Sequence, residues 1–127
     1  MLIDTSVIVE LLRHPSTSSD YKRIITELGE DNLYLSVIQL AELSDWCIKN
    51  GIEPNKHLEK IKKLTSILDL DESICIEAAR IKNQKRIAGC STFSLIDGIV
   101  IASARSISQR LLTFDRDFAG EKDCTVL

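Results

Sequence analysis

Short apolar runs alternate along the chain with longer segments whose apolar residues recur at helical spacing. The runs are of strand length and end in polar or turn-forming residues, which predicts strands at residues 2–3, 33–35, 67–70, 111–113 and 125–127. The segments between them predict helices over residues 7–12, 21–28, 37–51, 54–64, 71–85 and 94–104. Strands that alternate with helices favour a parallel sheet covered on both faces.

This order of segments predicts a single domain, residues 1–127, of the α/β class with a central parallel sheet of four to five strands. Helix boundaries carry their own signals. Ser36, with Gln39 three residues later, forms a capping-box pattern at the start of the third helix. Pro54 opens the fourth helix, on which Leu64 is expected to face the core and the lysines to face solvent.

Composition places the chain among ordinary globular proteins, since 44% of its 127 residues are apolar and 28% are charged. No stretch reaches the ~20 consecutive apolar residues of a membrane span, and no basic region precedes the first apolar run. We therefore expect a cytoplasmic protein without membrane contact. The four cysteines form no C-x-x-C pair and the two histidines stand alone, so we expect reduced, buried thiols, surface histidines and no zinc site.

The net charge of −3 argues mildly against a general nucleic-acid binder, whose footprint is usually basic. Charge is unevenly distributed, however. Nine of the sixteen basic residues, but only six acids, lie in residues 49–86. This asymmetry fits either a cationic rim beside an acidic pocket or a solvated pair of helices.

Asp4 follows directly on the first expected strand, with Thr5 and Ser6 behind it. In open α/β sheets, ligands bind at the carboxyl ends of strands where the strand order reverses, so an acid at this position is a candidate metal ligand. Asp4 or Ser6 also suits the N-cap of the following helix, which is the more frequent role for such a residue on its own. The choice depends on whether other acids reach the same place.

Two further acids lie in apolar surroundings on expected helices. Glu42 has Ile38 and Trp46 one turn away on either side, where a carboxylate is costly unless it is paired, protonated or bound to a cation. An edge position open to solvent explains Glu42 equally well. Asp97 stands in a helix almost free of charge, but Ser94-x-x-Asp97 also matches a capping box, and an acid in the first turn suits the helix dipole.

Asp115 and Asp117 follow the strand at residues 111–113, much as Asp4 follows the first strand. Turn formation or capping explains either acid alone. If the two strands are neighbours at the switch point, their carboxylates face one crevice. Clustered carboxylates repel strongly at effective dielectric constants near ~20, so a cation is expected among them. Oxygen ligands without His or Cys favour Mg²⁺ or Mn²⁺, which commonly bridge carboxylates and phosphates.

Taken together, these motifs resemble the PIN-domain family and, within it, the VapC-type toxins. The resemblance rests on residues 3–6, 36–43, 94–97 and 113–118, which follow the family's order and spacing over essentially the whole domain. It implies a three-layer α/β/α sandwich and a metal-dependent endoribonuclease that uses Mg²⁺ or Mn²⁺. It implies that the catalytic and metal-binding acids are Asp4, Glu42, Asp97 and Asp115, and that Asp117 is an additional acid near the ion.

The same resemblance gives further expectations for the site. Thr5, Ser6 and Thr113 match hydroxyl positions that would orient carboxylates or water. The implied reaction is hydrolysis of an RNA phosphodiester bond by water activated at the ion, giving 5′-phosphate and 3′-hydroxyl products. Basic residues around the cleft are candidates for contacting the RNA, although each is equally at home on an ordinary surface: Arg13, Lys82, Lys85, Arg86, Arg105 and Arg116.

The implied partners are a VapB-type antitoxin that covers or fills the acidic site, and a second copy of the chain in a homodimer. The helices over residues 21–28 and 37–48 are candidates for a partner groove, and covering the sheet explains them as well.

Four alternatives are weighed against the toxin, and two of them need a residue that this chain lacks. A haloacid-dehalogenase-like phosphatase needs a second Asp two residues after the first, where this chain has Ser6. A phosphoryl-receiver domain needs an acid after a middle strand, where this chain has Ser36. A catalytically silent PIN-fold module that binds RNA or a partner, and a housekeeping RNA-processing PIN nuclease, both stay open beside the toxin.

Overall fold

The computed structural model describes residues 1–127. Its elements follow in the order β1 (Leu2–Ile3), α1 (Thr5–Arg13), α2 (Ser19–Leu28), β2 (Tyr34–Ser36), α3 (Val37–Lys49), α4 (Pro54–Leu64), β3 (Ser66–Leu68), α5 (Glu72–Ile87), α6 (Leu95–Ser106), β4 (Leu111–Thr113), the 3-10 helix η1 (Arg116–Phe118) and β5 (Cys124–Val126). Each expected strand and helix is present, with boundaries shifted by at most two residues. Where a turn was expected after β4, the chain forms η1.

The five strands make one parallel sheet in the order β3-β2-β1-β4-β5. The chain first builds outward from β1 through β2 to β3, and then crosses to the other side of β1 to add β4 and β5. The strand order therefore reverses between β1 and β4, whose carboxyl ends lie side by side. This arrangement confirms the predicted parallel sheet and the expected neighbours at its switch point.

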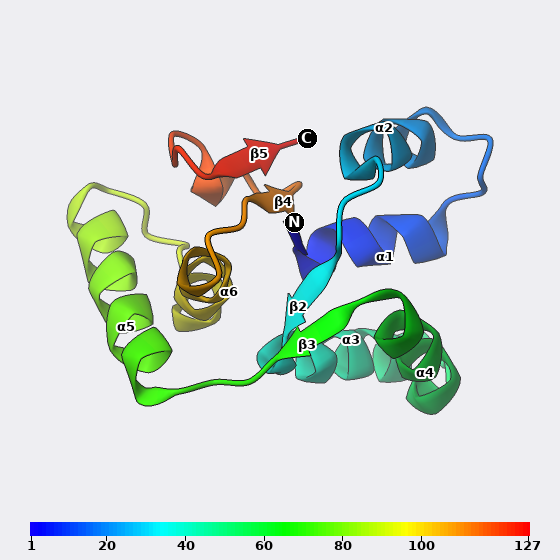
Figure 1. Ribbon diagram of the computed structural model, residues 1–127, viewed down its shortest axis with the longest axis horizontal. Coiled ribbons are helices and arrows are strands. Elements are labelled where there is room, and N and C mark those ends of the chain that lie inside the picture. The colour runs from blue at the N-terminus through cyan, green and yellow to red at the C-terminus, as the bar shows by residue number, and fades with distance from the viewer.

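Helices cover both faces of the sheet, as Figure 1 shows. Because side chains of a strand alternate between faces, Leu2 and Leu111 join a core with α5 and α6, while Ile3 and Leu112 join a second core with α1, α2, α3 and α4. The two cores on opposite sides of one sheet confirm the three-layer α/β/α sandwich.

The start of α6 is held tightly against α5. A Cβ atom added to Gly98 would lie 2.5 Å from the carbonyl oxygen of Ala78, which is too close for any side chain. Glycine at this position lets the backbones of the two helices approach, and the approach fixes the first turn of α6, including Asp97, relative to the sheet.

Some burial expectations are wrong. Leu64 is 73% exposed, because it lies about 120° around α4 from Leu58 and in the last turn of the helix, beyond the core. All four cysteines are free, but only Cys47 is buried and Cys75 is exposed. Cys75 lies one position away from the buried stripe of α5, which Ile74 and Ala78 occupy. No helix has both the length and the apolar character needed to cross a membrane.

Candidate functional site

Asp4 lies at the carboxyl end of β1, beside the end of β4. Its Oδ2 atom accepts hydrogen bonds from Ser6 Oγ at 2.6 Å and from Thr113 Oγ1 at 2.7 Å. Ser6 Oγ in turn accepts the backbone N–H of Phe114 at 3.1 Å. One oxygen of Asp4 is thus fixed by two hydroxyls, one from the first turn of α1 and one from the end of β4. Asp4 also stands at the N-cap of α1, but its side chain makes no capping bond.

Glu42 reaches the same region from α3. Thr5 Oγ1 donates a hydrogen bond of 2.5 Å to Glu42 Oε2, which ties this carboxylate to the residue next to Asp4. Burial raises the pKa of Glu42; the Thr5 hydrogen bond lowers it, and the charges of Asp4 and Asp97 raise it again. Glu42 therefore lies close enough to Asp4 and to Asp97 for their charges to repel its carboxylate.

Asp97 closes the capping box of α6 that the sequence predicts. Its Oδ2 accepts the backbone N–H of Ser94 at 2.6 Å, and its own N–H donates to Ser94 Oγ at 3.1 Å. The carboxylate nevertheless acts electrostatically on both Glu42 and Asp115. Capping and a place in the acidic cluster are compatible, because the first turn of a helix projects from its end.

The turn after β4 brings two acids. Asp115 accepts the backbone N–H of Asp117 at 2.8 Å through Oδ1, and its own N–H donates to Thr113 Oγ1 at 2.9 Å. Burial raises the pKa of Asp115; the N–H of Asp117 lowers it, and the charges of Asp117 and Asp97 raise it. The Asp117 carboxylate points to another partner, because its Oδ2 accepts a hydrogen bond of 2.6 Å from Thr92 Oγ1.

No ion pair in the structure involves any of the four core acids. They act on one another electrostatically in a chain that links Glu42 with Asp4 and Asp97, and Asp97 with Asp115. Beside Glu42, the surface is hollowed to about 480 Å³ between α3 and α6, with Ile38 and Ile96 on its walls. The arrangement is an acidic centre open to solvent and without a protein counter-ion.

The donor chemistry of this centre fits a hard divalent cation, since all available atoms are carboxylate oxygens. No three of the four acids have ligand atoms within 4.8 Å of one another. Mg²⁺ and Mn²⁺ need no such tight cage, because Mg²⁺ usually keeps several waters and takes one or two protein carboxylates. The acids at the carboxyl ends of β1 and β4 therefore suit such an ion, with water molecules completing its coordination shell.

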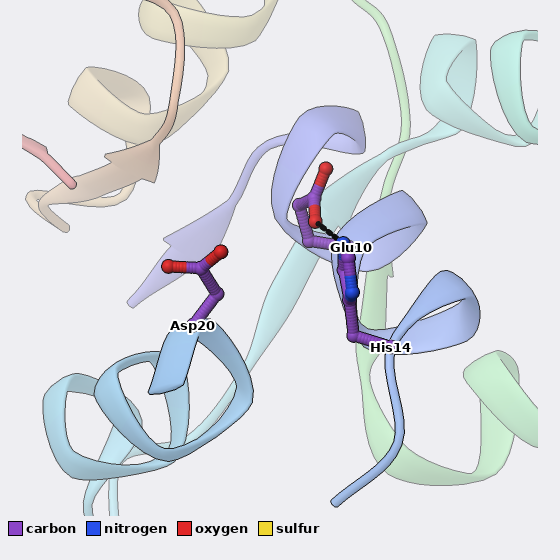
Figure 2. A group of neighbouring side chains, drawn as sticks. All are labelled: Glu10, His14 and Asp20. Carbon is purple, nitrogen blue, oxygen red and sulfur yellow. Dashed lines mark ion pairs between the residues drawn. The ribbon is translucent and has the colours of Figure 1, made fainter. Parts of the chain in front are cut away.

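Glu10, His14 and Asp20 form the one group of three His, Cys, Asp or Glu side chains whose ligand atoms all lie within 4.8 Å (Figure 2). Glu10 of α1 and His14, the C-cap residue of that helix, lie one turn apart and form an ion pair of 2.6 Å, while Asp20 comes from the first turn of α2. From the sequence, His14 is expected only to lie at the surface, and the i, i+4 spacing of Glu10 and His14 is the signal for this pair. The ion pair itself accounts for the contact.

Gln39 is the buried residue whose part in the site the sequence did not reveal. Its Oε1 accepts the N–H of Ser36 at 2.9 Å, as the capping-box pattern predicts, while its Nε2 donates to the carbonyl of Ile3 at 2.8 Å. One side chain thereby joins the end of β1, which carries Asp4, to the start of α3, which carries Glu42. The capping-box pattern revealed the first bond, and only the fold reveals the second.

The candidate RNA-contacting residues differ in how free they are. Lys85 and Arg105 form ion pairs within the chain, and Arg86 Nε donates to the carbonyl of Phe93 at 2.8 Å. Arg116 is exposed and directly follows Asp115. Arg13 is exposed too, but it lies at the far end of α1, about 12 Å along the helix from Thr5.

The fold and these residues define an α/β/α protein with an acidic, oxygen-donor centre at the switch point of a parallel sheet. The family model of the PIN domain matches residues 1–120. The chain therefore belongs to the PIN domain family, as its motifs predict. Comparison with curated protein sequences gives no match.

Solved structures with the same fold include three complexes. A toxin–antitoxin complex from Klebsiella pneumoniae matches with a TM-score of 0.77 and 19% identity, over 98% of this chain and 95% of that chain. FitAB bound to an IR36 DNA fragment matches with a TM-score of 0.76 and 26% identity, over 98% and 93%. VapBC2 from Rickettsia felis, bound to a DNA fragment from its promoter, matches with a TM-score of 0.76 and 17% identity, over 99% and 96%.

Proposed function

We propose that this protein is a Mg²⁺- or Mn²⁺-dependent ribonuclease of the cytoplasm and the toxin of a VapBC-type toxin–antitoxin pair. The observation that carries the proposal is the group of four acids, Asp4, Glu42, Asp97 and Asp115, which gather at the switch point of a PIN-domain sheet with no protein cation among them. Partly buried carboxylates that repel one another are stabilised by a bound cation, and such a cation can also activate water for phosphodiester hydrolysis.

When bound, Mg²⁺ or Mn²⁺ would polarise a water molecule and offset the charge of the scissile phosphate. The chain's own residues hold the carboxylates ready. Ser6 and Thr113 fix one oxygen of Asp4, and Thr5 fixes one oxygen of Glu42. Because these three hydroxyls already donate their protons to carboxylates, the expected nucleophile is water rather than a side chain. We expect 5′-phosphate and 3′-hydroxyl products.

The test uses the purified chain, mixed RNAs and either Mn²⁺, Mg²⁺ or EDTA, with Asp97→Asn as the main variant. An asparagine oxygen can still accept the N–H of Ser94, so the cap of α6 and the fold should survive. We expect cleavage with either metal, none with EDTA, and a loss of at least about 100-fold in Asp97→Asn and in Asp4→Asn.

Glu59→Gln is the matched control, because it removes one exposed acid of α4 and should cleave like the wild type. Full activity in both aspartate variants would end the metal-site assignment. RNA binding without cleavage in the wild type would favour the catalytically silent module. Release of phosphate from small esters, without RNA cleavage, would favour a phosphatase.

An apolar groove supports the antitoxin part of the proposal. It measures about 410 Å³ and runs between α1, α2 and α4, with Leu12, Ile25 and Leu64 among its partly open walls. His57 and Lys60 of α4 line it as well, so His57 is half-buried in this groove rather than fully at the surface. The Nδ1 atom of His57 is buried without a hydrogen-bond partner. The groove involves α2, one of the two helices considered for it from the sequence, but not α3.

The charges beside the groove indicate which kind of segment would bind there. Lysines crowd α4 beside the groove, with a single acid on that helix. The groove therefore suits an amphipathic segment of the antitoxin with an apolar face and acidic flanks. Three proteins of the same fold are solved as complexes, and one of these is a toxin–antitoxin complex.

The product of the adjacent open reading frame is the probe for this partner. Ile25→Asp should weaken its binding by about 10-fold or more, because a charge would be buried in the interface. Ile76→Asp is the control, since Ile76 is also 46% exposed but lies on α5, away from the groove. Equal binding by both variants would remove the groove from the proposal. We further propose a homodimer, which light scattering of the purified chain tests directly.

A further inference from the structure

Lys85 is a half-buried cation near the C-terminal end of α5, with only 15% of its side chain exposed. Its ammonium group forms an ion pair of 2.8 Å with Glu121 and donates a hydrogen bond of 3.1 Å to the backbone carbonyl of Asp117. It also lies 5.6 Å from the centre of the Phe93 ring, within the range of a cation–π contact. One side chain thus contacts two other segments, residues 117–121 after β4 and Phe93 before α6.

Both segments adjoin acids of the proposed metal centre. The carbonyl that Lys85 holds belongs to Asp117, whose N–H fixes the Asp115 carboxylate at 2.8 Å. The second segment is Phe93, which immediately precedes Ser94, the N-cap residue bonded to the Asp97 carboxylate. Lys85 therefore lies between the turn that holds Asp115 and the helix start that holds Asp97.

Neighbouring contacts reinforce the same junction. Arg86, next on α5, donates from Nε to the Phe93 carbonyl at 2.8 Å. The rings of Phe93 and Phe118 meet edge to face with centres 5.4 Å apart, and both are fully buried. The ring contact and the hydrogen bond from Thr92 Oγ1 to Asp117 Oδ2 at 2.6 Å join the two segments directly. The Lys85 ammonium group adds the hydrogen bond that ties the backbone of the turn to α5.

We propose that Lys85 is a positioning residue for the candidate metal centre, and that its ammonium group fixes the spacing between Asp97 and Asp115. This inference rests on the proposed nuclease function. It differs from the expectation that Lys85 contacts RNA, because the donor bonds of its ammonium group point to Glu121 and Asp117 within the chain.

The experiment compares three variants in the full chain. Lys85→Met keeps an unbranched apolar side chain over Phe93 but removes the charge, and Lys85→Arg restores a cation that can bond the same carbonyl. Arg80→Met is the control, because this substitution removes a positive charge from the same helix. The Arg80 side chain is 69% exposed and forms only a long ion pair of 3.9 Å with Glu77. The readouts are the Mn²⁺ dissociation constant, kcat and KM for RNA cleavage, and amide hydrogen exchange at Asp117 and Ser94.

We expect Lys85→Met to weaken Mn²⁺ binding by about 10-fold to 100-fold, the usual effect of losing a residue that orients metal ligands. The value of kcat should fall by a similar factor while KM changes by less than about threefold, and exchange at the Asp117 amide should accelerate. Lys85→Arg and Arg80→Met should stay within about threefold of the wild type in every readout.

Three results would overturn the inference. Lys85→Met could keep the wild-type Mn²⁺ affinity and kcat, or it could raise KM alone, which would make Lys85 an RNA contact. In the third result, Lys85→Arg is as impaired as Lys85→Met. A fall in kcat that equals the loss of folded protein in a urea titration would overturn it as well. If the wild type neither binds Mn²⁺ nor cuts RNA, the proposed function fails, and amide exchange then decides alone: faster exchange at Asp117 in Lys85→Met supports positioning, and unchanged exchange refutes it.

Discussion

Two groups of carboxylates in this protein are partly buried, yet their pKa values move in opposite directions. At the carboxyl end of the sheet, burial and neighbouring acids raise the pKa values of Glu42 and Asp115. Near β5, hydrogen bonds from basic side chains lower the pKa values of Glu121 and Asp123 despite their burial.

The second group is a network of ion pairs around Arg105, on α6. Its guanidinium group bonds Asp123 at 2.6 Å and Glu121 at 2.7 Å, and Lys85 bonds the other oxygen of Glu121 at 2.8 Å. The hydrogen bond with Asp123 is the main cause that raises the pKa of Arg105. Each carboxylate here has its counter-ion within the chain.

Both groups consist of partly buried Asp and Glu side chains, and they differ in the cations within reach. The network near β5 is complete as it stands and holds the C-terminal segment against α5 and α6. The acids near the carboxyl ends of β1 and β4 are stabilised only by hydroxyl and backbone donors. They therefore retain a mutual repulsion that a bound cation would offset. Breaking or exchanging these charges should therefore affect the two regions in opposite ways.

The largest effect is expected from removing the cation that completes the network. Arg105→Met leaves Glu121 and Asp123 partly buried without their shared partner, and should lower the free energy of unfolding by about 1–2 kcal/mol; the value is reduced because Arg105 is 33% exposed and solvent screens part of the loss. Urea titration at neutral pH measures it. Arg23→Met, at an exposed position of α2 outside any ion pair, should change stability by no more than about 0.5 kcal/mol. Equal losses in the two variants would contradict the comparison.

A smaller effect, of opposite sign in the two regions, is expected from neutralising one glutamate in each. In EDTA at neutral pH, Glu42→Gln should raise the free energy of unfolding by about 0.5–1 kcal/mol, because it removes a repelling charge while the amide oxygen still accepts the Thr5 hydrogen bond. Glu121→Gln should lower it by a similar amount, because it weakens bonds to Lys85 and Arg105. Thermal unfolding of both variants beside the wild type gives the sign of each change in stability. A destabilised Glu42→Gln would show that the acids near the carboxyl ends of β1 and β4 do not repel one another.

The smallest effect is the pH dependence of those two differences. A glutamate with a raised pKa in the folded state destabilises the fold while ionised, so the advantage of Glu42→Gln should shrink as the pH falls through that raised pKa. A glutamate with a lowered pKa contributes stability above its unfolded pKa of about 4.3, so the deficit of Glu121→Gln should persist until the pH falls below that value. Urea titrations from pH 7 to pH 3 in EDTA would show the first difference fading at higher pH than the second. The reverse order would contradict the assigned causes.

The sequence predicted the elements and the sheet well, because each rests on local periodicity. Ser94 and Asp97 indicate both a helix start and a candidate site acid. The structure has the helix start, with Asp97 in the capping box, and the Asp97 carboxylate also acts electrostatically on Asp115. The predicted burial was wrong where a helix extends beyond the core. Leu64 has the right residue type for burial, but it lies in the last turn of α4, where no element covers it.

What the sequence by itself determined is the kind of protein: strands and helices in alternation, and acids placed directly after two of the strands. Only the tertiary structure decided which charges meet. Lys85 and Arg105 read as candidate RNA contacts in the sequence, but packing of α5 and α6 against the β5 side of the sheet gives them to Glu121 and Asp123 instead. The physical reason is range: periodicity acts between residues a few positions apart, whereas electrostatic partners are chosen by distance in space.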